Sequence, residues 1–251
     1  MGRTFVFVNQ KGGVGKTTSV INLGAYIALA GKKTLLIDFD PQGNMSSGVG
    51  IQKKRPTIYD ALAKKSELKN AIYQTVVPNL FAVPASIDLS GATVELVDKQ
   101  NREFYLKNLL AELKNEYDYI IIDCPPSLGI LTLNGLTAAD EVFIPLQCEY
   151  FALEGLTLLL QTVQRVQQAL NPDLQIGGIF FTMYDSRTKL AQEVVQQVSS
   201  YFKTKVFPTI IPRNVKLSEA PSHGLPICTY DAKCSGARSY EKLAKEVLSR
   251  V

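Results

Sequence analysis

Lysines, glycines and hydroxyl residues are concentrated near the start of the chain. Residues 11–16 read KGGVGK, and Thr17 and Thr18 follow them. Glycine lacks a Cβ atom, so a glycine-rich backbone can fold around a phosphate group and point successive N–H groups at it. In such a loop Lys16 contacts the β- and γ-phosphates and the Thr17 hydroxyl binds Mg²⁺. The pattern predicts a phosphate-binding loop made of Gly12, Gly13, Val14, Gly15, Lys16, Thr17 and Thr18.

The sequence on either side supplies the structural context that such a loop needs. The apolar residues 5–8 predict a strand, and a helical pattern begins near Thr18. The unsatisfied N-terminal amides and the positive dipole end of that helix would therefore face the phosphates. A plain glycine-rich turn with solvated lysines is the alternative, but it leaves the coincidence of these features unexplained. A dinucleotide-binding fingerprint is excluded, because Thr18 stands where its third glycine belongs.

Three aspartates follow predicted strands elsewhere in the chain. Asp38 and Asp40 come after the apolar residues 34–37, and Asp123 ends the apolar run 119–122. Continuous apolar runs are typical of parallel strands buried on both faces. In open α/β sheets ligands bind beyond the carboxyl ends of the strands, so these acids are well placed to act on a ligand.

The elements that must position these residues alternate along the chain. We expect further strands at residues 80–84, 142–146, 176–182 and 206–211, and helices at residues 18–30, 102–117, 153–170 and 237–251. A helix after Lys189 is expected to face inward through Leu190, Val194, Val198 and Tyr201. The fold class is therefore α/β: a single doubly wound, mostly parallel sheet with helices on both faces, of the P-loop type, with residues 1–251 as one domain.

Composition limits the remaining possibilities. A net charge of +4 and a pI near 8.7 permit a polyanionic partner without requiring one. The four cysteines have no C-x-x-C spacing, so free thiols in a reducing compartment are expected. No apolar run approaches the ~18–20 residues that span a bilayer, and the first strand begins too early for a signal peptide. A cytoplasmic protein with no membrane partner is the expectation.

Taken together, the motifs resemble those of the ParA/Soj family of partition ATPases, within the ParA/MinD superfamily. Residues 11–18 are similar to its deviant Walker A motif, in which a second lysine, Lys11, opens the loop and Gln10 replaces the usual glycine. Residues 38–44 (DFDPQGN), 123–127 (DCPPS) and 212–224 are similar to three further motifs of the family. The resemblance covers nearly the whole chain, and it implies the short type without a helix-turn-helix extension.

The resemblance implies an ATPase with ATP and Mg²⁺ as cofactors, in which ATP binding joins two subunits face to face. Lys16 contacts the phosphates of its own subunit, and Asp40 orients the attacking water. Lys11 reaches across to the partner's nucleotide, where a cation supplied in trans can raise the rate ~10³–10⁵-fold. Gly12 lies where the two loops approach each other. Lys11, Lys16 and Asp40 are thus the expected catalytic residues.

The resemblance also implies residues for the metal and the base. Thr17 and Asp123, the latter as a Walker B carboxylate acting through water, would hold Mg²⁺, and Asp38 would lie near its coordination shell. Helix capping or turn chemistry is the alternative role for the acids. Pro212 and Asn214 would lie beside the nucleotide base.

The ATP-bound homodimer would present a basic surface to DNA. Its expected residues are Arg187, Lys189, Arg213 and Lys216, with Lys233 and Arg238 weaker. Relatives often carry lysine where Leu225 stands, so one charge is missing here, and a solvated surface charge is the alternative for any single member. Contacts to the phosphate backbone carry no sequence information, so the surface would bind double-stranded DNA non-specifically and salt-sensitively. A ParB-like adaptor would stimulate hydrolysis and release, and the protein would be associated with the nucleoid.

Three other functions share parts of this pattern. A MinD-like membrane ATPase needs a terminal amphipathic segment with a basic face, whereas the last helix here has a core-facing pattern. A NifH-like iron–sulfur protein needs cysteine spacings that this chain lacks. A small-molecule ligase using the same loop would act on a small acceptor and ignore DNA.

Overall fold

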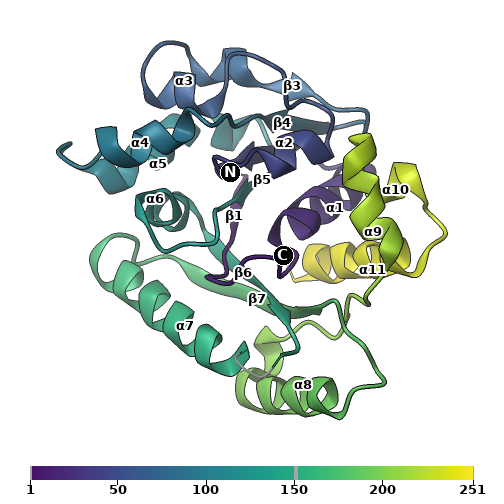
Figure 1. The fold of residues 1–251 in the computed structure, drawn as a ribbon. Helices are drawn as coiled ribbons and strands as arrows, with labels where there is room; N and C mark the ends of the chain where they lie inside the picture. The colour runs from purple at the N-terminus through teal and green to yellow at the C-terminus, as the bar shows by residue number, and fades with distance from the viewer. Residues whose placement is uncertain (1, 150–151, 251) are drawn as a thin grey trace.

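A seven-stranded sheet forms the centre of the computed structural model, which describes residues 2–149 and 152–250 (Figure 1). The strand order is β3-β4-β2-β5-β1-β6-β7, and every neighbouring pair is parallel except β3–β4 at one edge. The strands are β1 (Arg3–Phe7), β2 (Thr34–Asp38), β3 (Tyr73–Gln74), β4 (Leu80–Val83), β5 (Tyr119–Asp123), β6 (Glu141–Gln147) and β7 (Gln175–Thr182). The predicted mostly parallel sheet is confirmed.

Helices cover both faces of this sheet. The α-helices are α1 (Lys16–Leu29), α2 (Asn44–Gly48), α3 (Ile58–Leu62), α4 (Leu89–Glu95), α5 (Tyr105–Leu110), α6 (Ile130–Ala138), α7 (Ala152–Ala169), α8 (Lys189–Phe202), α9 (Val215–Glu219), α10 (Ile227–Tyr230) and α11 (Ser235–Ser249). Short 3₁₀ turns are η1 (Leu68–Ala71), η2 (Arg102–Phe104), η3 (Leu113–Asn115), η4 (Lys203–Lys205) and η5 (Ala220–His223). The predicted end of the last helix, Val251, lies outside the described residues.

The two faces bury separate apolar cores, because successive strand side chains point in opposite directions. Val6 and Ile122 pack into the core beneath α3 to α8. Phe7 and Ile121 pack into the other core, beneath α1, α2 and α9 to α11. Figure 1 shows α1 and α11 together on one side of the sheet, and α7 beyond it on the other. The strands are apolar throughout because both of their faces are covered, which explains the continuous runs in the sequence.

The register of the central strands brings the predicted site residues to one edge of the sheet. Phe7 pairs with Asp123, and Asp123 pairs with Asp38 on its other side. The glycine-rich loop starts just after β1, so it leaves the sheet beside both carboxylates. All three segments lie at the carboxyl ends of parallel strands, where ligands bind in open α/β folds.

The predicted strand at residues 206–211 does not form. The segment runs beside β7, where Phe207 N donates to Ile179 O at 2.8 Å and Ile211 N donates to Phe181 O at 2.8 Å. Pro208 has no N–H to donate, so regular pairing cannot continue through it. Thr209 instead donates its backbone N–H and its hydroxyl to Glu246 of α11, at 3.3 and 2.6 Å. Only isolated bridges remain, at Val206 and Pro212.

The predicted helix at residues 102–117 is also wrong, since the segment divides into η2, α5 and η3. Asn134 of α6 replaces helical hydrogen bonds at its start. The Asn134 side chain accepts a bond from Leu106 N at 3.1 Å and donates one to Arg102 O at 2.8 Å. At the other end Glu116 N donates to Leu113 O at 2.9 Å, which is the tighter 3₁₀ pattern.

The inward face of α8 is narrower than predicted. Val194 and Val198 are buried as expected, but the Leu190 side chain is 41% exposed and the Tyr201 side chain is 80% exposed. Phe202, the last residue of α8, packs against the core. Ala191 completes the buried stripe near the start of the helix.

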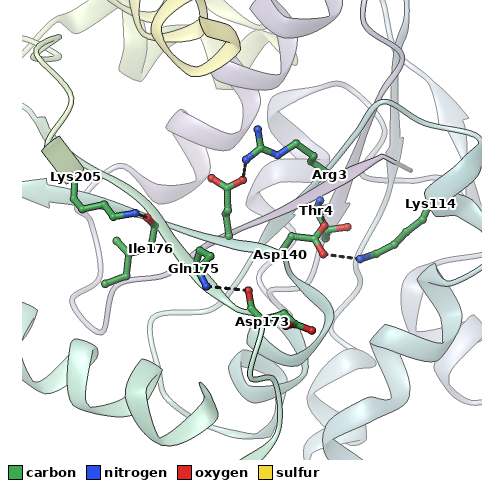
Figure 2. A network of polar contacts seen from close by, with 9 residues as sticks. Arg3, Thr4, Lys114, Asp140, Asp173, Gln175, Ile176 and Lys205 are labelled. Atoms are coloured by element: carbon green, nitrogen blue, oxygen red, sulfur yellow. Dashed lines mark hydrogen bonds and ion pairs between the residues drawn. The ribbon is translucent and has the colours of Figure 1, made fainter. Parts of the chain in front are cut away.

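Polar contacts close the opposite, amino-terminal edge of the sheet (Figure 2). Asp140 accepts a hydrogen bond from Thr4 N at 2.7 Å and forms an ion pair with Lys114 Nζ at 2.9 Å. Arg3 forms an ion pair with Glu141, and Lys205 Nζ donates to Ile176 O at 2.8 Å. These contacts join β1 to β6, η3 to the segment before β6, and η4 to β7, far from the predicted site. Within the described residues no helix is long and apolar enough to cross a membrane.

Candidate nucleotide-binding site

The glycine-rich loop adopts the curved backbone that its composition predicts. Gly13 and Gly15 have φ angles of 74° and 83°, in the left-handed region that residues with a Cβ rarely adopt. A Cβ on Gly13 would meet no atom within 4 Å, so the glycine is required by its backbone angle and not by crowding. Helix α1 starts at Lys16, directly after the loop, so its free N-terminal amides face the loop.

Side chains from neighbouring strands fix the loop in place. Thr182, the last residue of β7, donates its hydroxyl to Val14 O at 2.8 Å. Asn9 donates its side-chain amide to Pro145 O of β6 at 2.8 Å and accepts from Lys11 N at 3.0 Å. The loop is thus held from β6 and β7 before any ligand binds.

Lys16 lies over this loop as the sequence predicts. Its side chain is buried and its Nζ donates to Lys11 O at 3.2 Å. Burial lowers the pKa of Lys16, while the nearby carboxylates of Asp123 and Asp40 oppose that shift. A positive charge held among these acids is suited to bind the phosphates of a nucleotide together with a metal ion.

Asp123 is a buried carboxylate beneath the loop. It is fully buried, and neither of its side-chain oxygens has a hydrogen-bond partner in normal geometry among the described residues. Burial raises the pKa of Asp123 well above its usual range, and the neighbouring Asp38 raises it further, whereas the Thr17 hydroxyl beside it lowers it. Free carboxylate oxygens next to a threonine hydroxyl are donors that fit Mg²⁺.

Asp38 is engaged differently from Asp123. Its Oδ2 accepts hydrogen bonds from the backbone N–H and the hydroxyl of Ser46, at 2.7 and 2.5 Å. Ser46 Oγ in turn accepts from Ala85 N at 3.0 Å, so Asp38 joins β2 to α2 and to the segment after β4. Burial raises the pKa of Asp38 to about 7. Sequence reasoning missed Ser46, because a serine eight residues after an aspartate carries no local signal.

Asp40 faces the loop across a cavity. One oxygen of its carboxylate accepts from Gln42 N at 2.9 Å, in the turn that leads to α2. The cavity has a volume of about 490 Å³ and is lined by Asp40, Pro126, Met183 and loop residues that include Gly12, Gly13, Lys16 and Thr17. The structure therefore brings the predicted catalytic aspartate and the predicted phosphate ligands around one space.

An adjoining cavity of about 280 Å³ shares Gly15, Thr18 and Met183 with the first, and Pro212 and Asn214 line it. Asn214 caps α9 by accepting from Lys216 N at 2.9 Å, and its amide donates to Ser235 Oγ at 2.8 Å. Sequence reasoning missed Met183 and Tyr240, which also line this cavity. The unusual positive φ of 51° at Met183 cannot be read from its residue type.

Lys11 points away from its own loop. Its ammonium forms an ion pair with Glu149, and both side chains are about half exposed. A third cavity, of about 330 Å³, lies here between the loop and the start of α7. Glu149 was not predicted, since it stands 138 residues after Lys11 in the chain and no local pattern links the two.

The four predicted DNA-binding residues lie on two connected segments. Arg187 and Lys189 flank the start of α8, and all four residues are exposed. Arg213 N donates to Tyr184 O at 3.1 Å, which joins the segment after β7 to the segment before α9. Arg213 also lines the cavity that holds Pro212. The basic residues and the second cavity thus share one stretch of backbone.

Comparisons with known proteins agree with this geometry. A family model described as an AAA domain matches residues 2–176. The chain is 76% identical to the chromosome-partitioning ATPase Soj of Treponema pallidum over 250 residues, covering 100% of this chain and 98% of that protein. It is 55% identical to the sporulation initiation inhibitor protein Soj of Bacillus subtilis, with 98% of each chain covered.

A solved structure is also similar over the whole chain. The cobyrinic acid a,c-diamide synthase of Mycobacterium smegmatis, with a bound ATP analog and magnesium, matches with a TM-score of 0.89 and 38% identity. The match covers 100% of this chain and 95% of that one. Because the identity to Soj proteins is much higher and extends over the full length, the chain belongs to the ParA/Soj family of partitioning ATPases.

Proposed function

We propose that this ATPase is a DNA partition switch: ATP binding joins two copies, the dimer binds double-stranded DNA non-specifically, and hydrolysis releases it. One observation carries the proposal. Arg213 belongs to the basic surface and also lines the cavity next to the phosphate loop. The expected nucleotide site and the expected DNA site therefore share a backbone segment, as a nucleotide-controlled DNA surface requires.

ATP and Mg²⁺ are the cofactors, and the residues present fit them. The main-chain amides of the loop and Lys16 would bind the phosphates, and Pro212 and Asn214 would lie beside the base. Thr17 and Asp123 would hold Mg²⁺, since the oxygens of Asp123 have no other partner among the described residues. Bound there, the metal neutralises phosphate charge during phosphoryl transfer.

Asp40 and Lys11 would act at the reacting phosphate. Asp40 lines the cavity beside Lys16 and would orient the attacking water. Lys11 is half exposed and paired outward with Glu149, so it is free to move toward a second copy once that ion pair opens. A Cβ added to Gly12 would lie 3.9 Å from Pro126 Cβ, an ordinary van der Waals distance, so its own subunit leaves room for a side chain there. A bulkier residue at Gly12 would hinder the approach of two loops.

The remaining parts of the proposal concern context. Residues 1–251 would act as one domain, and a ParB-like adaptor would stimulate hydrolysis and so end DNA binding. The protein would then associate with the nucleoid only in its ATP-bound form. Non-specific phosphate contacts explain why such binding needs no particular sequence.

The test is DNA binding by fluorescence anisotropy with ATP, a non-hydrolysable analogue, ADP or no nucleotide, over a salt series. Binding is expected only with the triphosphates, together with a dimer on gel filtration, and affinity should fall steeply with salt. Lys16→Ala serves as the control, because it removes the phosphate contact and should lose the nucleotide response. A protein that stays monomeric and ignores DNA with the analogue would refute the proposal.

The similarity to a cobyrinic acid a,c-diamide synthase supports a second candidate, ATP-dependent amidation of a small carboxylic acid. That function predicts ATP turnover that depends on an acceptor and an amide donor and that is unaffected by DNA. The same DNA titration, followed by phosphate release with and without an acceptor, separates the two.

A further inference from the structure

We propose that two carboxylates, Asp185 and Glu219, occupy phosphate positions on the basic surface and mask it until DNA displaces them. The inference rests on the proposed DNA-binding function and adds to it a built-in competitor for the DNA backbone. The basic surface is defined here as Arg187, Lys189, Arg213 and Lys216.

The Arg187 side chain is already bound as it would bind a phosphate. Its Nε donates to Asp185 Oδ1 at 2.8 Å and its Nη2 donates to Asp185 Oδ2 at 2.6 Å. Two parallel N–H···O bonds are the arrangement by which a guanidinium also recognises a phosphate group. Arg187 N donates to Asp185 Oδ1 at 3.0 Å as well, so the turn itself holds the acid in place.

Arg213 acts on the same carboxylate from the other segment. The two segments meet where Arg213 N donates to Tyr184 O at 3.1 Å. The Arg187 hydrogen bonds hold the pKa of Asp185 far below its usual range, and the charge of Arg213 lowers it further. Asp185 therefore stays ionised, held by the Arg187 guanidinium in the position that a backbone phosphate would take and further favoured by the positive charge of Arg213.

Glu219 masks the fourth cation in the same way. Lys216 Nζ lies 2.9 Å from Glu219 Oε2. The same oxygen accepts a hydrogen bond from the Tyr230 hydroxyl at 3.0 Å, and the Tyr230 ring stacks on His223 with centroids 5.0 Å apart. These contacts fix Glu219 beside Lys216, so the acid is ordered and not a freely moving surface charge.

The result is a surface with half of its positive charge neutralised. Within the described residues Lys189 and Arg213 make no ion pair, whereas Arg187 and Lys216 are both paired. DNA must replace two carboxylates to contact all four cations. Exposed ion pairs are weak, so each mask should reduce DNA affinity by about fivefold at most.

The masking also predicts the salt dependence of binding. When a phosphate displaces a carboxylate, that carboxylate takes up a cation from solution and offsets the counterion released from DNA. Removing the carboxylate removes this offset, so the slope of log affinity against log salt should steepen by up to ~0.9 for each freed contact.

The test compares Asp185→Asn, Glu219→Gln and the double variant with wild type in DNA titrations with a non-hydrolysable ATP analogue at several salt concentrations. Asparagine can still accept the turn bond from Arg187 N, so the fold is preserved while the charge is lost. The control is Glu193→Gln, which removes an exposed acid of α8 that makes no ion pair within the described residues. ATP affinity and circular dichroism check that each variant is intact.

We expect each single variant to bind DNA about two- to fivefold more tightly than Glu193→Gln and the double variant up to about 25-fold more tightly, with a steeper salt slope. If wild type binds DNA and the variants match Glu193→Gln in affinity and slope, the masking is wrong and the DNA function stands. If neither wild type nor any variant binds DNA in any nucleotide state, the proposed function fails and the masking with it.

Discussion

Asp38 and Asp123 end the adjacent strands β2 and β5, yet their carboxylates have different surroundings. Among the described residues the Asp123 oxygens have no hydrogen-bond partner in normal geometry, whereas both Asp38 oxygens accept hydrogen bonds from main-chain and serine donors. The two acids share burial but not hydrogen bonding: Asp38 joins β2 to α2 through Ser46, and Asp123 makes no such bond within the described residues. Sequence motifs place both at a strand end, and only the surrounding donors distinguish them.

The buried carboxylate of Asp38 makes stability depend on pH. Its folded-state pKa is about 7, against about 3.9 when unfolded, so the folded protein binds more protons between these values. The free energy of unfolding of wild type, relative to Asp38→Asn, should fall as pH rises from about 4 to 7 and then level off. Urea denaturation in the absence of metal and nucleotide measures this difference, and a pH-independent difference would contradict the assignment.

Asp40 should separate binding from hydrolysis. Asp40→Ala removes the group expected to orient water. It leaves the glycine-rich loop, Lys16 and the cavity lined by Pro212 and Asn214 intact. We expect ATP binding to persist, hydrolysis to fall by at least ~10²-fold, and the ATP-bound dimer to accumulate. Phosphate release and gel filtration with ATP measure both effects. Hydrolysis at the wild-type rate would remove Asp40 from the reaction.

At the scale of elements, polar contacts fix the helix that follows the loop. Ser19 of α1 is buried and shares a hydrogen bond of 2.8 Å with the Tyr240 hydroxyl of α11. Asn22 donates to Thr18 O at 2.8 Å and accepts from Ile227 N of α10 at 2.7 Å. Helix α1 is therefore bonded to two C-terminal helices, α10 and α11, which fix the glycine-rich loop relative to the cavity lined by Pro212 and Asn214.

Tyr240→Phe should show how much the Ser19–Tyr240 hydrogen bond contributes to stability. The change leaves the Ser19 hydroxyl buried without its Tyr240 partner, so the free energy of unfolding should fall by about 1–3 kcal/mol. Ser19→Ala combined with Tyr240→Phe removes both partners and should cost less than the two single changes together. Urea denaturation of the four proteins provides the double-mutant cycle, and strict additivity would show that the two hydroxyls are not coupled.

Strands were predictable where a continuous apolar run in the sequence is buried on both faces of the sheet. The runs at residues 34–37 and 119–122 are apolar because both faces are buried, and both form central strands. Residues 206–211 have the same character, but Pro208 interrupts the ladder. Glu149 could not be predicted because its partner Lys11 stands 138 residues away. Ser46 could not be predicted because its eight-residue distance from Asp38 matches no local pattern.

Across the whole molecule, the two edges of the sheet have separate roles. The amino-terminal edge is closed by polar contacts that include the Arg3–Glu141 and Lys114–Asp140 ion pairs, as Figure 2 shows, while the carboxyl edge carries the glycine-rich loop and the three cavities described above. Lys11 lies at the outer limit of that edge, bound to Glu149. The dimer contact proposed for Lys11 would thus have to compete with an ion pair inside each copy.

Glu149→Gln should shift this competition toward the dimer. The variant frees Lys11, and because an exposed ion pair is worth only ~0.2–1 kcal/mol, the dimer should form at up to about fivefold lower protein concentration. Analytical ultracentrifugation with a non-hydrolysable ATP analogue measures the shift. Glu154→Gln, which changes another acid lining the same cavity, is the matched control. An equal shift in both variants would show that only net charge matters.

The end of β7 directly connects the glycine-rich loop to the segment that carries Arg213. Thr182 holds the glycine loop through Val14 O, and two residues later Tyr184 O holds Arg213. Nucleotide exchange that moves the loop by a fraction of an ångström would pull on a strand terminus and reorient the arginines with it. Under the proposed function, residues 182–184 alone would transmit the effect of the nucleotide to the DNA-binding arginines, without a hinge or a domain rotation.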